Sequence, residues 1–142
     1  ENTVLTACLL YACKKSDDPT DLEKVKSYAK DGAEYLATLG FPKRFCKICE
    51  EANRYTGSTN REKESDILEL VDQFGGMLLH RPERIAFKID EAMVLLEYRN
   101  LKGKNNRYLE KFKQFIEIME NLKVNGVGNG LITDLQERMN AA

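Results

Sequence analysis

The chain has 142 residues, of which 42% are hydrophobic and 32% charged, and its formal net charge at pH 7 is −1. This size and composition predict one soluble folded domain and exclude a disordered segment. The charge balance argues against a nucleic-acid-binding protein, which needs a basic surplus to contact phosphates. Because the sequence has neither a membrane-spanning apolar run nor a signal-peptide pattern, we expect a cytoplasmic protein.

Apolar residues recur three and four positions apart through the first part of the chain, which predicts helices. The first predicted helix carries an apolar stripe of Val4, Cys8, Leu9 and Ala12. Thr20 and Glu23 have the spacing of a capping box, and they open a second helix that Gly40 ends. Pro42 suits the first turn of a third helix, whose apolar positions are Phe45, Ile48, Cys49 and Ala52.

The helical pattern continues after a predicted loop at 55–61. We expect a fourth helix to begin at Ser65 or Asp66, to be interrupted by Gly75 and Gly76, and to stop at residues 80–82. Its apolar positions are Ile67, Leu68, Val71 and Phe74. A short helix at 90–98 and a long amphipathic helix at 109–122 follow. The long helix carries Phe112, Phe115, Ile116 and Met119 on one side.

No alternation typical of β-strands persists anywhere, so the sequence predicts an all-α bundle of about six to seven helices. We expect residues 1–123 to form the helical domain. Residues 124–142 are expected to form a glycine-rich linker and a C-terminal helix at 131–139. Since Glu1 stands at the start of an apolar helix, with no initiator methionine, we interpret the chain as the C-terminal part of a longer domain.

The four cysteines are Cys8, Cys13, Cys46 and Cys49, and the last two have the CxxC spacing of a zinc or redox site. Zinc would need two further ligands, which Cys8 and Cys13 supply only if their helices meet face to face. Because the CxxC pair lies on an apolar helical stripe, we interpret the thiols as buried core residues. Zinc binding and redox chemistry remain alternatives.

The segment ILELVDQFGGMLLHRPER, at 67–84, resembles part of the bacterial HD-GYP phosphodiesterase domain. That family has an apolar run into an aspartate, an aromatic residue and then Arg-Pro before a short helix. The matching residues are Asp72, Phe74, Arg81, Pro82 and Arg84. Four further stretches are similar to the family in its order and spacing: LLYACKK (9–15), YAKDG (28–32), RYTGS (54–58) and IDEAMVLL (89–96). The resemblance implies an HD-domain-like helical bundle.

The resemblance also implies metal-dependent hydrolysis of cyclic di-GMP, because histidine and aspartate ligands hold two or three metal ions in that family. In this chain the ligand positions are occupied by Tyr11, Ala12, Tyr28, Glu51 and Ala52, and the Gly-Tyr-Pro motif becomes Thr-Asn-Arg at 59–61. Glu50, Glu51 and Asp72 could hold Mg²⁺, but the alanines donate no lone pair. We therefore predict no catalysis, no bound metal and no cofactor.

Lys15 and Asp72 are the expected remnants of the family's functional positions. We interpret Asp72 as a helix carboxylate that pairs with Lys15 or an arginine inside the bundle. Tyr11 and Tyr28 are expected to fill the volume that metals and imidazoles occupy in the family. The single histidine, His80, aligns with a position that is not a ligand.

Three arginines, Arg54, Arg81 and Arg84, are candidate contacts to a nucleotide or a protein partner, since guanidinium groups bind phosphate in pairs of hydrogen bonds. For Arg81 and Arg84 we favour ion pairs with Glu83 or Asp90.

The leading functional hypothesis is a non-catalytic interaction or regulatory module in bacterial signalling. Its expected partner is another protein, a fused signalling domain or a second copy of the chain. An alternative is a metal-free cyclic di-GMP receptor that uses Lys15 and the three arginines. A third hypothesis takes TACLLYACKK, at 6–15, as resembling one helix of cyclin-like transcription factors.

Overall fold

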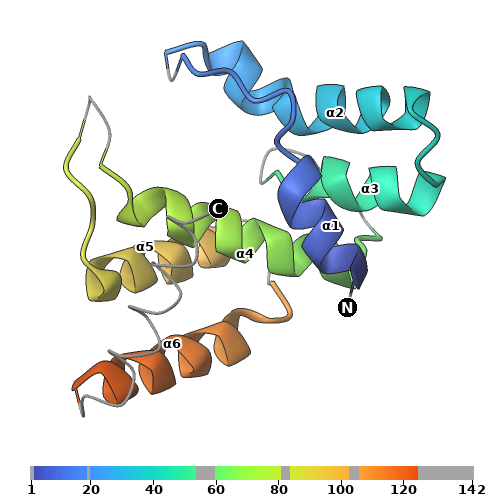
Figure 1. Ribbon diagram of the computed structural model, residues 1–142. Helices are drawn as coiled ribbons and strands as arrows, with labels where there is room; N and C mark the ends of the chain where they lie inside the picture. The colour runs from blue at the N-terminus through green and yellow to red at the C-terminus, as the bar shows by residue number, and fades with distance from the viewer. Residues whose placement is uncertain (1, 19, 54–59, 81–83, 103–105, 125–142) are drawn as a thin grey trace, which may run out of the picture. The chain divides into compact units, whose positions relative to one another are not determined.

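Six α-helices make up the regular structure of the described part of the chain (Figure 1). The computed structural model describes residues 2–18, 20–53, 60–80, 84–102 and 106–124. The helices are α1 (Asn2–Leu10), α2 (Leu22–Thr38), α3 (Lys43–Glu51), α4 (Lys63–Leu78), α5 (Ile89–Lys102) and α6 (Leu109–Val124). Among these described residues there is no β-strand, which confirms the predicted all-α class.

The chain divides into two compact units, Glu1–Asn106 and Arg107–Ala142. The first unit contains α1 to α5, and α6 belongs to the second. Helix α6 begins at Leu109, as the sequence predicts, and the Phe112 amide donates to the Tyr108 carbonyl at 2.8 Å. The predicted linker at 125–130 and helix at 131–139 lie outside the described residues, and the domain boundary near residue 124 stays a prediction.

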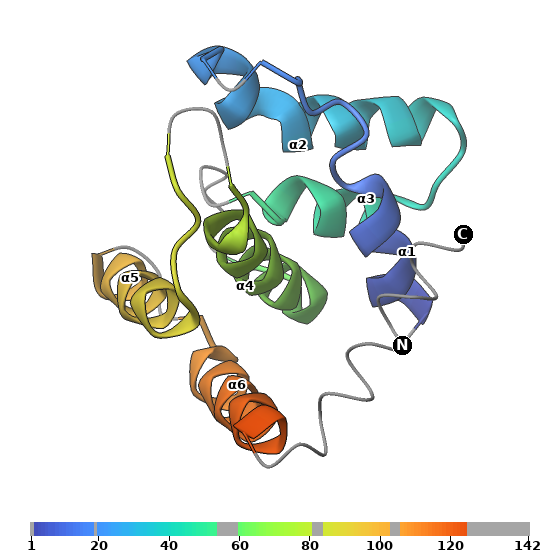
Figure 2. The same ribbon diagram turned by 60° about the vertical axis from the view of Figure 1, so that its left-hand side comes forward.

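Helices α2 and α3 form an antiparallel hairpin (Figure 2). The connection begins at Gly40, whose φ of +88° is costly for any residue with a side chain. Two hydrogen bonds close the end of α2: the Gly40 amide donates to Ala37 at 3.1 Å and the Phe41 amide donates to Leu36 at 3.2 Å. This is a Schellman ending, and the apolar pair Phe41 and Leu36 packs in the same core.

The start of α2 differs from the predicted capping box. Asp21, not Thr20, is the N-cap, and its carboxylate accepts from the Lys24 amide at 3.1 Å. The Thr20 hydroxyl is engaged elsewhere, because it donates to Asp18 at 2.6 Å. Thr20 and Asp21 are both good N-cap residues and are adjacent in the sequence, so the capping-box spacing of Thr20 and Glu23 did not identify the true N-cap.

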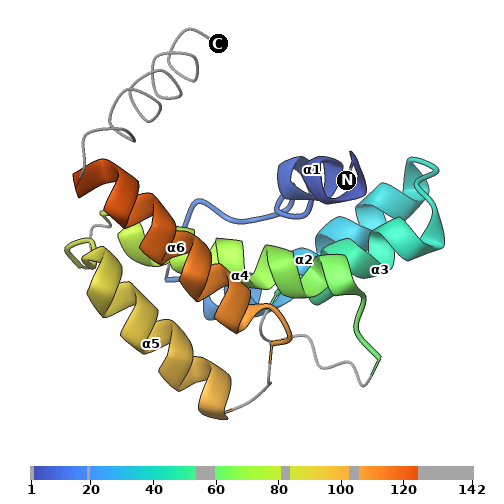
Figure 3. The same cartoon turned by 90° about the horizontal axis from the view of Figure 1, so that it is seen from below.

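Helix α1 contacts both α3 and α4 (Figure 3). Its predicted apolar stripe is wrong for two members, because Cys8 and Leu9 are exposed, Leu9 by 83%. Val4 and Ala12 are half-buried, and Ala7, outside the stripe, is fully buried. The helix is apolar on nearly every side, so periodicity could not select the buried face. The small side chain of Ala7 allows α1 to approach the other helices closely.

Helix α4 begins at Lys63, earlier than predicted, and continues through Gly75 and Gly76 without interruption. A glycine inside a helix costs about 1 kcal/mol relative to alanine. Here the helix is held by burial of Phe74 and Met77 on either side of the glycine pair. Ser65 and Asp66, the predicted entry, lie within its first turn and are buried.

Helix α5 begins at Ile89 and is longer than the predicted segment 90–98. The Glu91 carboxylate accepts from the Lys88 amide at 2.9 Å, which satisfies a free donor at the helix start. Ala92, Met93 and Leu96 are buried, and α5 packs against α4.

The core of the first unit lies where α1, α2, α3 and α4 meet. Its buried members are Ala7, Ala33, Leu36, Phe45, Cys46, Ile48, Cys49, Ala52 and Leu68. The third-helix stripe predicted from the sequence is therefore confirmed. None of the helices built from described residues is long and apolar enough to cross a membrane.

Candidate functional site

Three side chains from the N-terminal part of the chain contact the carboxylate of Asp72, which lies on α4. The Tyr11 hydroxyl donates to Oδ1 at 2.5 Å and the Tyr28 hydroxyl donates to Oδ2 at 3.3 Å. Lys15 Nζ lies 3.8 Å from Oδ1, so the expected ion pair is present. We call these four residues, Tyr11, Lys15, Tyr28 and Asp72, the Asp72 cluster. It joins segments up to 61 positions apart in the sequence.

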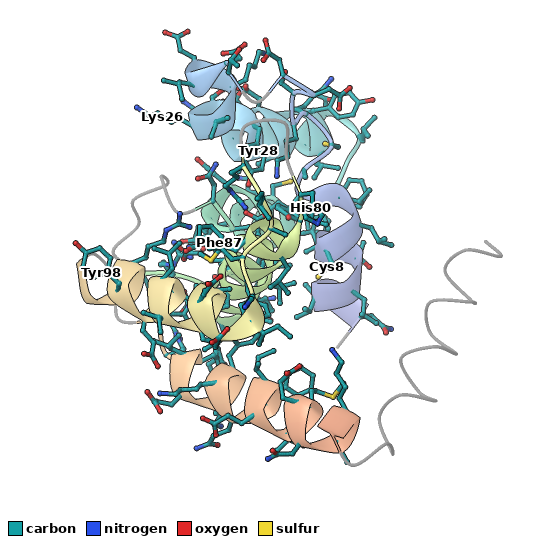
Figure 4. The ribbon with its side chains drawn as sticks, turned by 90° about the vertical axis from the view of Figure 1, so that its left-hand side faces the viewer. Cys8, Lys26, Tyr28, His80, Phe87 and Tyr98 are labelled. Carbon is teal, nitrogen blue, oxygen red and sulfur yellow. The ribbon has the colours of Figure 1, made fainter. Side chains whose placement is uncertain are left out.

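Local structure explains why the two tyrosines reach Asp72. Tyr28 lies on the buried face of α2, which also presents Ala29 and Gly32, and its side chain extends from α2 (Figure 4). Tyr11 stands in the turn after α1, where its amide donates to the Ala7 carbonyl at 2.9 Å. A Cβ at Gly32 would lie only 3.2 Å from the Tyr11 carbonyl oxygen, so the glycine allows this turn to rest on α2.

The electrostatics of the cluster keep Tyr11 protonated. Burial raises the pKa of Tyr11 far above its ordinary value near 10, and the hydrogen bond to Asp72 and the charge of Asp72 raise it further. The phenol is therefore a hydrogen-bond donor and a poor metal ligand at neutral pH. Lys15 Nζ also lies 5.2 Å from the centre of the Tyr28 ring, a cation–π distance.

Tyr11 and Tyr28 contribute packing as well as hydrogen bonds. Their ring centres are 6.4 Å apart and the ring planes are tilted by 57°, within the range of favourable aromatic pairs. The Asp72 side chain is 22% exposed and Lys15 is 42% exposed, so the cluster is partly open to water.

The other two helix positions singled out by the family resemblance lie away from this cluster. Glu51 is buried, and its Oε1 accepts from the Glu62 amide at 3.0 Å and from the Ser65 hydroxyl at 3.2 Å. It thus satisfies one backbone donor and one hydroxyl at the start of α4. Ser65 precedes Asp72 by seven residues, about 10 Å along a helix. Ala52 is fully buried in the core.

A metal centre of the HD-GYP kind does not fit these side chains. Both oxygens of Asp72 accept hydrogen bonds from phenols, while Ala12 and Ala52 have no donor atom. Glu51 uses its Oε1 at the start of α4, away from Asp72. Within the described ranges, no three histidine, cysteine, aspartate or glutamate side chains gather closely enough to hold a metal ion.

Only one of the three candidate arginines lies in the described part of the chain, because Arg54 and Arg81 fall outside it. Arg84 donates to the carbonyls of Gly76 at 2.9 Å and of Met77 at 3.3 Å, with longer contacts to two others. Its guanidinium also lies 4.9 Å from the centre of the Phe87 ring. Arg84 therefore closes the end of α4, and its expected pairing with Glu83 falls outside the described residues.

The strongest ionic contacts involve residues that the sequence analysis missed. Arg61 Nε donates to Asp66 Oδ1 at 2.8 Å, and Arg61 donates a second hydrogen bond to Glu69 Oε2 at 2.6 Å. All three side chains are 9% exposed or less. We call Arg61, Asp66 and Glu69 the Arg61 cluster. The sequence feature that could have indicated this cluster is a pair of carboxylates one turn apart on α4, Asp66 and Glu69. A search for apolar periodicity does not detect such a pair.

The cysteines divide into two classes. Cys46 and Cys49 are buried, as predicted, but Cys8 and Cys13 are exposed, so the expectation of four core thiols is wrong for these two. Burial raises the pKa of Cys49 to about 12, and charge on Cys46 and Cys13 adds to this effect. Cys49 is therefore a thiol rather than a thiolate at neutral pH.

Comparison with protein-family models, with curated proteins and with solved structures gives no match for this chain. The resemblance to HD-GYP domains rests on the motifs described above. The geometry of the Asp72 cluster is an independent observation to set beside those motifs.

Proposed function

We propose that this chain is a degenerate HD-GYP-like domain that acts as a non-catalytic interaction module in bacterial signalling. One observation carries the proposal. Four residues that the family resemblance selected, from three separate motifs, meet at one place in the fold as the Asp72 cluster. Motifs matched by chance give no reason for their side chains to converge.

The chemistry of the cluster supports a domain without hydrolytic activity. Metal-assisted phosphodiester hydrolysis requires imidazole and carboxylate ligands that hold the ions and generate hydroxide. Here tyrosines stand at two of those positions, and alanines stand at two more. The raised pKa of Tyr11 and the hydrogen bonds on Asp72 leave no strong donor set.

An exposed apolar face on α1 supports an interaction role. Leu5 is 62% exposed and Leu9 is 83% exposed, and their spacing of four places them on the same side of the helix. Exposed leucines one turn apart form an apolar stripe of the kind that helix-to-helix association buries. We propose that this stripe contacts the partner, and a second copy of the chain is the partner most directly tested.

Enzymatic assay tests the first half of the proposal. The protein is produced in medium enriched in iron and manganese, and its metal content and its hydrolysis of cyclic di-GMP and the linear dinucleotide are measured. We expect substoichiometric metal and no turnover. Stoichiometric metal together with turnover would contradict the proposal.

Sedimentation velocity over a range of protein concentrations tests the second half. We expect reversible self-association that Leu9→Ser weakens. Leu22→Ser is the matched control, because Leu22 is 68% exposed but lies at the start of α2. A monomer at every concentration, or equal effects of both substitutions, would contradict self-association through α1.

The alternative of a metal-free nucleotide receptor is favoured by one feature, the 42% exposure of the Lys15 side chain beside the cluster. Lys15 is already paired with Asp72, and Arg84 is engaged with backbone carbonyls. Calorimetric titration with cyclic di-GMP decides between the two functions. Heat that saturates with wild type and disappears with Lys15→Met would replace the interaction module with a receptor.

A further inference from the structure

Two thiols approach the same turn of α2 from different directions. Cys13 is exposed in the turn after α1, and its Sγ lies 3.5 Å from the position that a Cβ would take at Gly32. The absence of a side chain at Gly32 is what permits this approach. The Cys13 sulfur therefore lies directly on α2, although the residue as a whole is reached by solvent.

Cys49 reaches that region from α3. The α2–α3 hairpin turns through residues 39–42, and Gly32 and Cys49 each lie seven residues from an end of this connection, so they stand at the same level of the hairpin. Cys49 is fully buried in the core that also contains Ala33, the neighbour of Gly32. Burial raises the pKa of the Cys49 thiol, and charge on Cys46 and then on Cys13 adds to this effect.

Cys46 belongs to the same helix but occupies a different place. Its Sγ donates to the Phe41 carbonyl at 3.7 Å, at the end of the hairpin where α2 and α3 are joined. The thiol one turn further along α3, Cys49, is the one level with Gly32. Cys8 lies on α1 itself and is exposed. Cys13, beside Gly32, and Cys49, level with Gly32 on α3, are therefore the two thiols placed at the same turn of α2.

We propose that Cys13 and Cys49 are a redox pair that forms a disulfide when the protein meets a hydroperoxide. The exposed Cys13 thiolate attacks the peroxide, forming an S–O bond while the O–O bond breaks and the released hydroxide takes a proton to become water. The Cys49 sulfur then attacks Cys13 sulfur. The S–S bond forms, the S–O bond breaks, and the leaving hydroxide takes the Cys49 proton. Two thiols and one hydrogen peroxide give one disulfide and two waters.

The disulfide would fix the turn that carries Tyr11. In the reduced protein this turn is held by the hydrogen bond of Tyr11 to Asp72 and by its contact with Gly32. A covalent link to α3 closes the chain between residues 13 and 49 and restricts the unfolded state. The oxidised protein is therefore expected to unfold at a higher temperature, with the Asp72 cluster held in place.

Peptide mass spectrometry tests the pair on the full chain. After treatment with one equivalent of hydrogen peroxide and alkylation, a tryptic digest separates Cys46 from Cys49, because Lys47 lies between them. We expect a disulfide between peptides 1–14 and 48–54. Because peptide 1–14 contains both Cys8 and Cys13, the variants Cys8→Ser and Cys13→Ser assign the partner.

The link must survive in Cys8→Ser and disappear in Cys13→Ser. A link that persists in Cys13→Ser, a link to peptide 45–47, or further oxidation of Cys13 with no link would each overturn the proposal. Thermal unfolding with and without a thiol reductant supplies a second readout. The midpoint should fall on reduction in wild type and Cys8→Ser, and stay constant in Cys13→Ser.

Discussion

Helix α4 carries two polar clusters of opposite construction. In the Arg61 cluster, a guanidinium forms ion pairs with two carboxylates, and all three side chains are 9% exposed or less. In the Asp72 cluster, one carboxylate is met mainly by two neutral phenols, and its lysine partner is 42% exposed. The carboxylates of both clusters, Asp66 and Glu69 in one and Asp72 in the other, lie on the same helix. The contrast between the clusters therefore comes from the side chains around these carboxylates.

The difference shows where this fold tolerates chemical change. A charge removed from water is costly unless its partner is in place, so no member of the Arg61 cluster can be replaced alone without a large loss. The two hydrogen-bond donors to Asp72 are neutral phenols, its ion-pair partner Lys15 is partly exposed and water can reach the site, so substitutions there have smaller effects. The proposed loss of metal ligands around Asp72 is therefore compatible with an α4 that keeps its fold.

The largest expected effect follows from breaking the Arg61 cluster. Replacement of Arg61 by methionine keeps an unbranched side chain of similar length but removes the guanidinium that contacts the buried carboxylates of Asp66 and Glu69. We expect the free energy of unfolding to fall by about 3–5 kcal/mol. Urea denaturation followed by circular dichroism measures it.

Arg44→Met is the matched control for that experiment. Arg44 contacts Glu62 at 3.0 Å and Glu64 at 2.9 Å, but its side chain is 55% exposed. Solvent screening limits such a pair to about 0–1 kcal/mol. Equal losses for the two arginines would contradict the distinction between buried and exposed pairing.

Removal of the Asp72 carboxylate has the next largest expected effect. Asp72→Ala deletes the acceptor of two hydrogen bonds and the partner of Lys15. Hydrogen bonds to charged groups contribute roughly 1.5–3 kcal/mol, and we expect a loss in that range because water can replace part of the contact. Asp72→Asn, which keeps an acceptor oxygen, should lose less. A loss larger than that of Arg61→Met would reverse the proposed ranking of the clusters.

The sequence predicted helices well where a repeating pattern was closed by a clear signal. The α2–α3 hairpin is an example, because apolar spacing defined both helices and Gly40 marked the turn. The same reasoning failed for the interruption of α4 at Gly75 and Gly76. Local preference disfavours glycine in a helix, but packing of Phe74 and Met77 outweighs it.

Of the polar contacts between distant parts of the chain, the sequence predicted the Lys15–Asp72 pair but not the Arg61 cluster. The Lys15–Asp72 pair was expected because two motifs pointed to a common site. Arg61 was singled out only as the last residue of the altered Gly-Tyr-Pro motif in a polar loop, and its pairing with Asp66 and Glu69 depends on where that loop meets α4. Hydrophobic periodicity carries no information about such polar contacts.

The dependence of stability on alkaline pH tests whether the Asp72 cluster holds Tyr11 protonated. The pKa of folded Tyr11 is raised above its unfolded value near 10, so its contribution to stability is full below about pH 10. Above that pH the unfolded state loses the proton first, and stability falls. Tyr11→Phe removes this term, so its unfolding free energy should fall less steeply than that of wild type above about pH 10. Parallel curves there would show that Tyr11 is not held protonated.

Two glycines give the smallest predicted effects and serve as controls for each other. Gly75→Ala should stabilise by about 0.5–1 kcal/mol, since alanine favours helix and nothing lies within 4 Å of the new Cβ. Gly32→Ala should gain less or destabilise, because its Cβ meets the Tyr11 carbonyl oxygen at 3.2 Å and Cys13 Sγ at 3.5 Å. Thermal unfolding of both variants measures the difference. Equal stabilisation would show that the Tyr11 turn does not rest on α2.

The direct contact between Tyr11 and Asp72, which lie 61 positions apart, is the observation on which the proposed function rests. A double-mutant cycle of Tyr11→Phe and Asp72→Ala, read by urea denaturation, tests it most directly. We predict a coupling free energy between the two substitutions of about 1–3 kcal/mol, because each removes the same hydrogen bond. Losses that add to within about 0.5 kcal/mol would show that the two residues act independently and would contradict the account.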